Sequence, residues 1–196
     1  IRYWQVENEP LLEYGPCPKP DYKRFKKEIE LVKSLTPIPV LITDSGELTT
    51  WYRTMQLSDV FGFSLYRSVW SPWFGHVDYP LPPLFYTVKE KIIKVLSGTR
   101  NQYSMVSELQ AEPWAPSKQD LKSMEISEQV ELFPPEKMEK NVLYARQTGF
   151  NPIYLWGVEW WYYMKEKGVP EYIQSAKSLF DDANNSSKTS KIIDTI

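Results

Sequence analysis

The sequence predicts an α/β protein of the (β/α)8 TIM-barrel type, here a partial barrel with about five of the eight strands. Five apolar runs alternate with helical patterns, and each run is continuous in apolar residues, as in parallel strands that are buried on both faces. None of the runs is followed by the Gly-x-Gly-x-x-Gly turn that a doubly wound sheet usually carries after its first strand. These observations favour a barrel, and a small open sheet is the alternative.

Each element follows from a local pattern. The first strand begins at Ile1 and ends abruptly at Asn8-Glu9-Pro10, and Phe25 and Ile29 in the next segment recur at helical spacing. The other strands are short β-branched or aromatic runs, a long aromatic loop covers residues 67–83, and glycines stop several of the helices. The predicted strands are residues 1–7, 38–43, 60–66, 103–109 and 152–156, and the predicted helices are residues 21–35, 47–57, 84–96, 134–149, 159–167 and 171–180.

The domain organisation is one folded unit and a tail. Residues 1–180 are expected to form the C-terminal part of a barrel domain, and residues 181–196 are polar and small, which predicts a disordered tail. A whole barrel takes about 250 residues, and this chain opens on Ile1 inside a strand without a methionine. We therefore expect that the front of the barrel is missing and that the isolated piece is inactive.

Composition excludes several classes of function. The net charge of −2 provides no basic field for nucleic acid, and no apolar run approaches the roughly 20 residues that span a bilayer. The single Cys17 excludes an internal disulfide, and the lone His76 has no second ligand at metal-binding spacing. No phosphate loop or Ser-His-Asp arrangement is visible. No cofactor or metal is expected, and localisation and oligomeric state stay open.

Carboxyl groups at strand ends are the sharpest candidates for chemistry. Glu9 ends the first strand beside Asn8, and Glu108 closes the fourth, so a barrel would bring both to its C-terminal mouth. A carboxyl in apolar surroundings can act as a general acid, and a second carboxylate about 5 Å away can act as a nucleophile towards a sugar. Glu112, in the loop after the fourth strand, is the alternative to Glu108. Asp44 is not assigned a role, because Asp-Ser-Gly is also a good turn sequence.

Aromatic residues make up 15% of the chain, which is more than a core of this size needs. Their flat amphipathic rings suit sugar faces, although about half of them are expected to pack in the core. Tyr66 is placed to hydrogen-bond the nucleophilic carboxylate, and Trp156 to form the floor under the reacting sugar. Further substrate contacts are predicted for Trp70, Trp73 and Trp114.

At these residues the chain resembles the large clan of retaining glycoside hydrolases built on the βα barrel, clan A, which includes cellulases, mannanases and β-galactosidases. Asn8-Glu9-Pro10 resembles the acid/base motif at the end of strand four in that clan, and Glu108 falls where the clan keeps its nucleophile at the end of strand seven. Tyr66 and Trp156 match the aromatic positions of strands six and eight. The resemblance implies that the chain holds strands 4 to 8.

The resemblance implies hydrolysis of β-linked oligo- or polysaccharides with retention, with Glu9 as acid/base, Glu108 as nucleophile and Asn8 on the hydroxyl next to the reacting carbon. A non-catalytic carbohydrate-binding barrel is the alternative function. A barrel enzyme unrelated to sugars, such as an aldolase, would require a strand-end lysine or a metal cluster, and neither is visible. The sugar, the linkage, and the choice between endo and exo action are not determined by the sequence.

Overall fold

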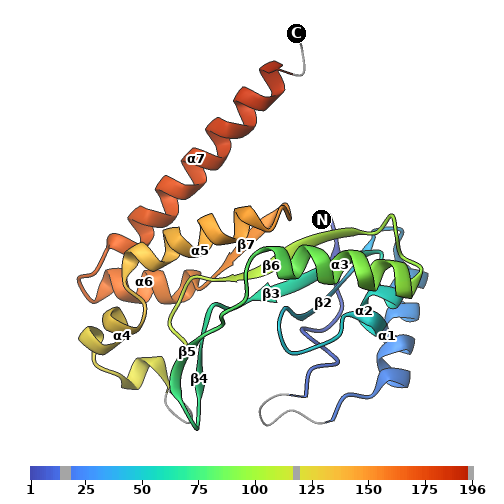
Figure 1. Ribbon diagram of the computed structural model, residues 1–196, viewed down its shortest axis with the longest axis horizontal. Helices are drawn as coiled ribbons and strands as arrows, with labels where there is room; N and C mark the ends of the chain where they lie inside the picture. The colour runs from blue at the N-terminus through green and yellow to red at the C-terminus, as the bar shows by residue number, and fades with distance from the viewer. Residues whose placement is uncertain (14–18, 117–119, 194–196) are drawn as a thin grey trace. The chain divides into compact units, whose positions relative to one another are not determined.

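The computed structural model describes residues 1–13, 19–116 and 120–193, with side chains described as far as Asn185, so Cys17 lies outside the described residues. The chain divides into two compact units. The first comprises residues 1–66, 80–109 and 144–155, and the second comprises residues 67–79, 110–143 and 156–196. Each unit is described by itself below, with the element labels of Figure 1.

A curled parallel sheet of five strands forms the centre of the first unit (Figure 1). Its order, β1-β2-β3-β6-β7, follows the order of the strands along the chain. A doubly wound sheet reverses its strand order at a switch point, whereas this sheet has no reversal and is consistent with part of a barrel. The strands are β1 (Trp4–Gln5), β2 (Val40–Ser45), β3 (Val60–Leu65), β6 (Tyr103–Gln110) and β7 (Ile153–Trp156).

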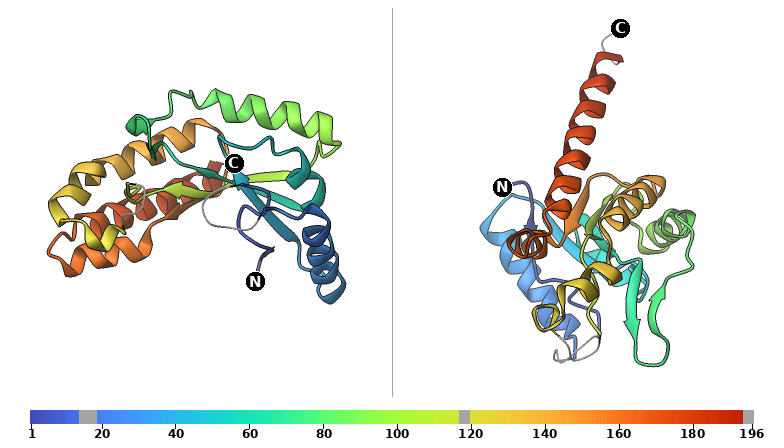
Figure 2. Two further views of the ribbon diagram at one scale, coloured as in Figure 1. Left: turned by 90° about the horizontal axis from the view of Figure 1, so that it is seen from below. Right: turned by 90° about the vertical axis from the view of Figure 1, so that its left-hand side faces the viewer.

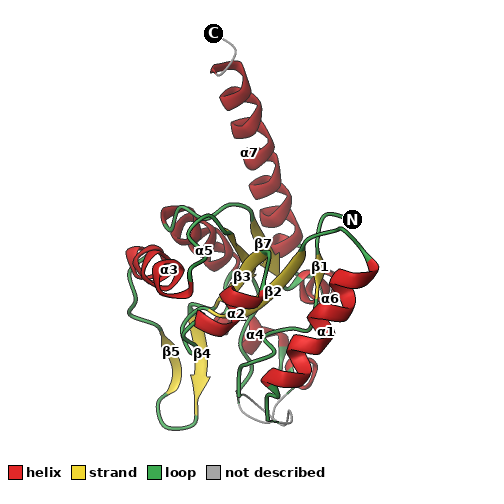
Figure 3. Ribbon diagram, turned by 90° about the vertical axis from the view of Figure 1, so that its right-hand side faces the viewer, coloured by secondary structure: helices red, strands yellow, loops and turns green. Residues whose placement is uncertain are grey.

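Three helices of the first unit cover one face of this sheet (Figure 3). They are α1 (Tyr22–Leu35), α2 (Tyr52–Leu57) and α3 (Leu84–Ser97). The Asp21 side chain caps α1 by accepting from the backbone N–H groups of Lys23 and Arg24, and the buried Phe25 of this helix packs with Ile42 of β2. Figure 2 shows α1, coloured blue, alongside the first strands of the sheet.

Aromatic rings join the other two helices to the same face. The Trp51 ring, just before α2, lies 4.8 Å from the Phe63 ring of β3, which stacks on the Tyr86 ring of α3 at 5.6 Å. The opposite face holds a smaller apolar cluster of Leu41, Val60 and Met105. Because side chains alternate along a strand, the polar Thr43 and Ser64 share that second face.

An irregularity in β6 changes the direction of Glu108. Gly62 pairs with Met105 and Phe63 with Val106, but Ser64 pairs with Glu108, so one extra residue is inserted in β6. Without the insertion, Glu108 would alternate to the helix-covered face together with Val106. The bulge therefore turns the Glu108 side chain to the face that holds Ser64.

The second unit is built around aromatic and amide contacts between its helices. The buried Trp160 packs edge-on against Phe133 and Tyr172, and its indole N–H donates to Gln129 Oε1 at 2.7 Å. This unit holds a hairpin of β4 (Ser68–Ser71) and β5 (Gly75–Asp78), η1 (Leu121–Ser123), α4 (Ile126–Leu132), most of α5 (Pro135–Gln147), α6 (Val158–Glu166) and α7 (Glu171–Ile193). Part of the aromatic content is thus explained by packing.

The structure differs from the sequence prediction at five places, one of which is α2, which begins at Tyr52 rather than at residue 47. The first strand is only two residues long, because the backbone bends after Gln5 and takes positive φ at Glu7 and Glu9. The predicted loop 67–83 contains the antiparallel β4–β5 hairpin, and the segment before α5 contains η1 and α4. The last helix continues to Ile193 rather than ending near 180.

The described side chains near the end of α7 are exposed. From Phe180 to Asn185 every side chain is exposed, so burial of apolar surface contributes little to this part of the helix. An isolated helix of this length is marginal in water. Disorder of the polar tail therefore stays a prediction, although the backbone here is helical.

Candidate functional site

The Glu9 carboxyl lies against the second face of the sheet in the first unit. Its Oε1 accepts a hydrogen bond of 2.5 Å from Ser64 Oγ. Burial raises the pKa of the Glu9 carboxyl, the Ser64 hydrogen bond lowers it, and the negative charge of Asp44 raises it, with a net rise above the ordinary value. A carboxyl whose pKa is raised holds its proton to a higher pH than an ordinary glutamate, as a general acid must.

Thr43 of β2 fixes the bend that carries Asn8 and Glu9. Its hydroxyl accepts from the Glu9 backbone N–H at 3.1 Å and donates to Asn8 Oδ1 at 3.2 Å. Gln5 Nε2 also donates to Asn8 Oδ1, at 3.0 Å. Within the described part of the chain, the bonds shown for the Asn8 amide involve only its oxygen. These contacts hold Glu9 at a positive φ of 45°, which a non-glycine residue adopts only when its surroundings fix it.

Glu108 is buried in β6, with 8% of its surface exposed. Its Oε2 accepts a hydrogen bond from the Tyr66 hydroxyl at 3.3 Å, and Tyr66 directly follows β3. A phenol hydrogen bond stabilises a carboxylate in its charged form. This is the contact that the sequence predicted for Tyr66.

Ser64 contacts Glu9 and is the neighbour of Glu108 in the sheet. Its hydroxyl donates to Glu9, and its Cα is the register partner of the Glu108 Cα in the neighbouring strand. The Glu108 backbone therefore lies beside Ser64 in the neighbouring parallel strand, and the bulge places Glu108 on the same face of the sheet.

Two charged residues that the sequence did not assign form a network on the helix-covered face. Asp44 is buried and accepts from Thr54 Oγ1 at 2.7 Å and from the Ser45 backbone N–H at 2.9 Å, and burial raises its pKa above the ordinary value. Lys89 of α3 donates to the Gly46 and Thr49 carbonyls at 2.7 Å each, and burial lowers the pKa of its amine to about 8.

Glu112, the alternative nucleophile, belongs to the second unit together with Trp156. Burial raises the pKa of the Glu112 carboxyl, a hydrogen bond with the Trp156 side chain lowers it, and the charge of Glu159 raises it. Trp156 is 47% exposed. Gly157 allows the backbone after Trp156 to lie close to Ala111 and Glu112. Its φ is 132°, and a Cβ at this position would lie 2.9 Å from the Ala111 carbonyl oxygen, which is too close for any other residue.

The remaining aromatic candidates also belong to the second unit. Trp70 lies in β4 and meets the His76 ring of β5 edge-on at 5.1 Å, and Trp73 is 87% exposed at the tip of the hairpin. Trp114 follows β6 and is half-buried. Their role in binding a substrate stays a prediction, as it does for Trp156.

Neither a metal-binding cluster nor a membrane-spanning helix is present among the described residues. No group of three or more His, Cys, Asp or Glu side chains in residues 1–13, 19–116 and 120–193 is arranged to hold a metal ion. No helix in the same residues has both the length and the apolar character to cross a bilayer.

Sequence reasoning missed three residues that interact with the candidate carboxyls or with residues beside them. Ser64 binds Glu9, Thr43 binds Asn8 and the Glu9 backbone, and Lys89 interacts with Asp44. Ser64 and Thr43 interrupt otherwise apolar strands, and this interruption is the signal that could have identified them. Their partners lie 55 and 34 residues away, respectively, so only the fold brings them together.

Comparison with known proteins gives little further information. No family model and no curated protein matches the chain. An FMN-binding β-glucuronidase from Facaelibacterium prausnitzii L2-6 is similar in structure, with 14% identity and a TM-score of 0.44 over 79% of this chain and 22% of that chain. A Faecalibacterium prausnitzii β-glucuronidase has 17% identity and a TM-score of 0.41 over 79% of this chain and 24% of that chain. The chain spans about a quarter of these structures, and a likeness of this size assigns neither a family nor a reaction.

Proposed function

We propose that the chain is the C-terminal part of a TIM-barrel glycoside hydrolase, strands 4 to 8, and that it supplies the carboxyl pair that cleaves a β-glycosidic bond with retention. The observation that supports this most is the position of Ser64, which donates to Glu9 and pairs with Glu108 in the sheet. Ser64 thus connects the segment that carries Glu9 with the strand that carries Glu108, near the C-terminal ends of β3 and β6, where barrel enzymes hold their catalytic residues. A retaining mechanism requires two carboxyls about 5 Å apart.

The proposed roles follow from the two environments. Glu9, whose pKa is raised chiefly by burial, protonates the leaving oxygen and later removes a proton from water. Glu108, which accepts the hydrogen bond from Tyr66, attacks the anomeric carbon and forms the glycosyl-enzyme ester. The Asn8 amide, fixed through its oxygen by Thr43 and Gln5, donates from its nitrogen to a substrate hydroxyl.

Glu108 is preferred to Glu112 as the nucleophile. Glu108 lies in the same unit and on the same sheet face as Ser64, which contacts Glu9. Glu112 belongs to the other unit, where its carboxyl is hydrogen-bonded with the Trp156 side chain. A nucleophile also requires a rigid support, which β6 gives to Glu108.

Catalysis is proposed for a completed barrel and not for the five strands alone. In the part of the chain that is described, β1 and β7 are the two ends of the sheet. Open edges leave the sugar-binding side incomplete and favour association with other chains. The isolated chain is therefore expected to be inactive.

The test uses the longer polypeptide that completes the barrel, with an activated aryl β-glycoside as substrate. Glu108→Ala should abolish turnover, and added azide should restore it and give a glycosyl azide of inverted configuration. Glu9→Ala should slow poor leaving groups most, and azide should then give a product of retained configuration.

Glu112→Ala is the matched control and should keep most of the activity. Unimpaired turnover by Glu108→Ala would contradict the assignment. Sugar binding without any hydrolysis by the intact protein would instead support the non-catalytic carbohydrate-binding alternative.

A further inference from the structure

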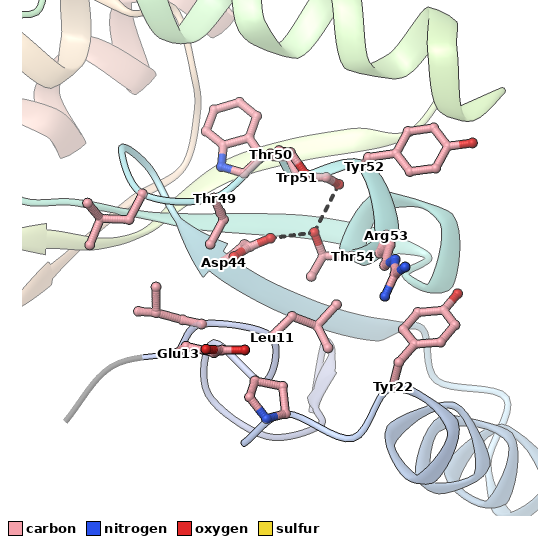
Figure 4. Close-up of a pocket in the computed structure, with 13 residues that line it drawn as sticks. Leu11, Glu13, Tyr22, Asp44, Thr49, Thr50, Trp51, Tyr52, Arg53 and Thr54 are labelled. Atoms are coloured by element: carbon pink, nitrogen blue, oxygen red, sulfur yellow. Dashed lines mark hydrogen bonds between the residues drawn. The ribbon is translucent and has the colours of Figure 1, made fainter. Parts of the chain in front are cut away.

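A cavity of about 640 Å³ lies in the first unit between the segment that follows β1 and the start of α2 (Figure 4). Asp44, which lines it, alternates to the helix-covered face of β2, whereas Thr43, the contact of Glu9, alternates to the opposite face. The cavity is therefore a different site from the carboxyl pair. Its volume is within the range of small-molecule sites, about 300–1,000 Å³.

The polar groups of the cavity include both donors and acceptors. The Asp44 carboxylate is held by Thr54, and the Arg53 guanidinium lies 5.0 Å from the centre of the Tyr22 ring (Figure 4). The backbone segment 49–50 adds two threonine hydroxyls. A sugar hydroxyl both donates and accepts, so it can bond to the exposed Arg53 guanidinium and to a threonine hydroxyl, whereas the Asp44 oxygens are already engaged by Thr54 and the Ser45 N–H.

The charged groups at the cavity do not favour an anion. Asp44 and Glu13 contribute two negative charges, and Arg53 contributes one positive charge. Lys89 interacts electrostatically with both Asp44 and Glu47, so its positive charge is shared between two carboxyls. An anionic ligand is therefore disfavoured, whereas a neutral ligand avoids this repulsion provided that its hydroxyls are hydrogen-bonded.

Apolar surface completes the lining. Leu11, Leu48 and the ring of Tyr22 face the same space as the polar groups. A pyranose has C–H faces that pack on such surface and hydroxyls at its edge that need polar partners. The mixture of the two in one cavity therefore suits a sugar ring better than a purely apolar molecule.

We propose that this cavity binds a neutral pyranose unit, at a second carbohydrate site separate from Glu9 and Glu108. The site goes beyond the proposed hydrolysis and does not depend on it. In a longer saccharide it would hold a unit that is not being cleaved.

The test is a titration of the ¹⁵N-labelled 196-residue chain, followed by amide chemical shifts. The probes are methyl β-D-glucopyranoside, which is neutral, and methyl β-D-glucopyranosiduronate, which has the same ring with a carboxylate. The neutral probe should produce saturable shifts in residues 48–54, and the anionic probe should bind more weakly.

Two substitutions test the lining. Arg53→Gln removes the exposed guanidinium and Tyr22→Ala removes the ring, and each should weaken binding of the neutral probe by about tenfold. The matched controls are Arg146→Gln, at an exposed arginine of α5, and Tyr162→Ala, at an exposed tyrosine of α6, and both should bind as the unmodified chain does.

The outcomes separate this proposal from the proposed hydrolysis. The cavity proposal is overturned if residues 48–54 show no saturable shift, if the anionic probe binds more tightly, or if the cavity variants bind like their controls. Shifts confined to Glu9, Ser64 and Glu108 would also overturn it, while supporting the proposed hydrolysis.

Discussion

Gly46 is predicted to be indispensable to the packing around Ser64. A Cβ at this position would lie 2.3 Å from the Ser64 carbonyl oxygen and 3.2 Å from the Tyr86 ring. Ordinary contact begins at 3.4 Å, so the Ser64 backbone would have to move by about 1 Å. The Gly46 backbone N–H also donates to this same oxygen, at 3.0 Å.

The expected cost of Gly46→Ala follows from these contacts. Overpacking a close-packed site costs about 1–3 kcal/mol, and a lost backbone hydrogen bond costs about 1 kcal/mol. The backbone is the less yielding partner in this contact, so we expect a loss of about 3–4 kcal/mol in the free energy of unfolding. The displacement of Ser64 should also weaken its hydrogen bond to Glu9.

Gly98→Ala is the matched control. Gly98 has a φ of 77° at the end of α3, and a Cβ there would meet nothing within 4 Å. This variant therefore reports only the backbone conformational cost, about 1 kcal/mol. Urea titrations followed by tryptophan fluorescence measure both variants, provided that their m-values agree. A Gly46→Ala variant no less stable than Gly98→Ala would refute the reasoning.

Three further predictions concern titration and order. The folded state binds the Glu9 proton more tightly than the unfolded state, so stability falls as the pH rises from 4.5 through the raised pKa. Glu9→Gln should therefore melt at a higher temperature than the unmodified chain at about pH 7. Equal melting temperatures at that pH would contradict the burial of this carboxyl. The pKa of Lys89 is lowered from 10.5 to about 8, so the folded state loses this proton at a lower pH than the unfolded state, and stability should rise between these two pH values. Urea titrations should show that Lys89→Met lacks this part of the rise. An identical rise in both proteins would contradict the prediction. Amides from Phe180 to Ile193 should exchange hydrogen much faster than those around Tyr172, because every described side chain from Phe180 to Asn185 is exposed whereas Tyr172 is buried; uniform protection along α7 would contradict the predicted disorder of the tail.

Most of the fold could be predicted from the sequence because its strands are strongly apolar. The runs around Ile42, Phe61 and Val106 are buried on both faces, and such runs stand out without any knowledge of the fold. The β4–β5 hairpin was missed because its strands are short and its turn contains Pro72 and two exposed aromatic residues in place of a two-residue turn.

The sequence proposed the carboxyls of the candidate site but not the residues that support them, and the catalytic roles of Glu9 and Glu108 stay predictions. Glu9 and Glu108 follow from the rule that barrel residues at strand ends carry chemistry. The bulge that turns Glu108 towards Ser64 has no local signature, because the residues around it form an ordinary apolar strand. The contacts of Ser64 and Thr43 depend on strand register, which alternation along one strand cannot supply.

The central claim is that Glu108 is the nucleophile of a retaining mechanism, and covalent trapping tests it most directly. The longer polypeptide that completes the barrel would be incubated with 2,4-dinitrophenyl 2-deoxy-2-fluoro-β-glycosides of several sugars, which accumulate the glycosyl-enzyme. Glu108 and Glu112 fall on one tryptic peptide, residues 101–118, so fragmentation in the mass spectrometer must locate the label. We predict a fluorosugar ester on Glu108. A label on Glu112, or no covalent label on a protein that hydrolyses the parent glycoside, would contradict the claim.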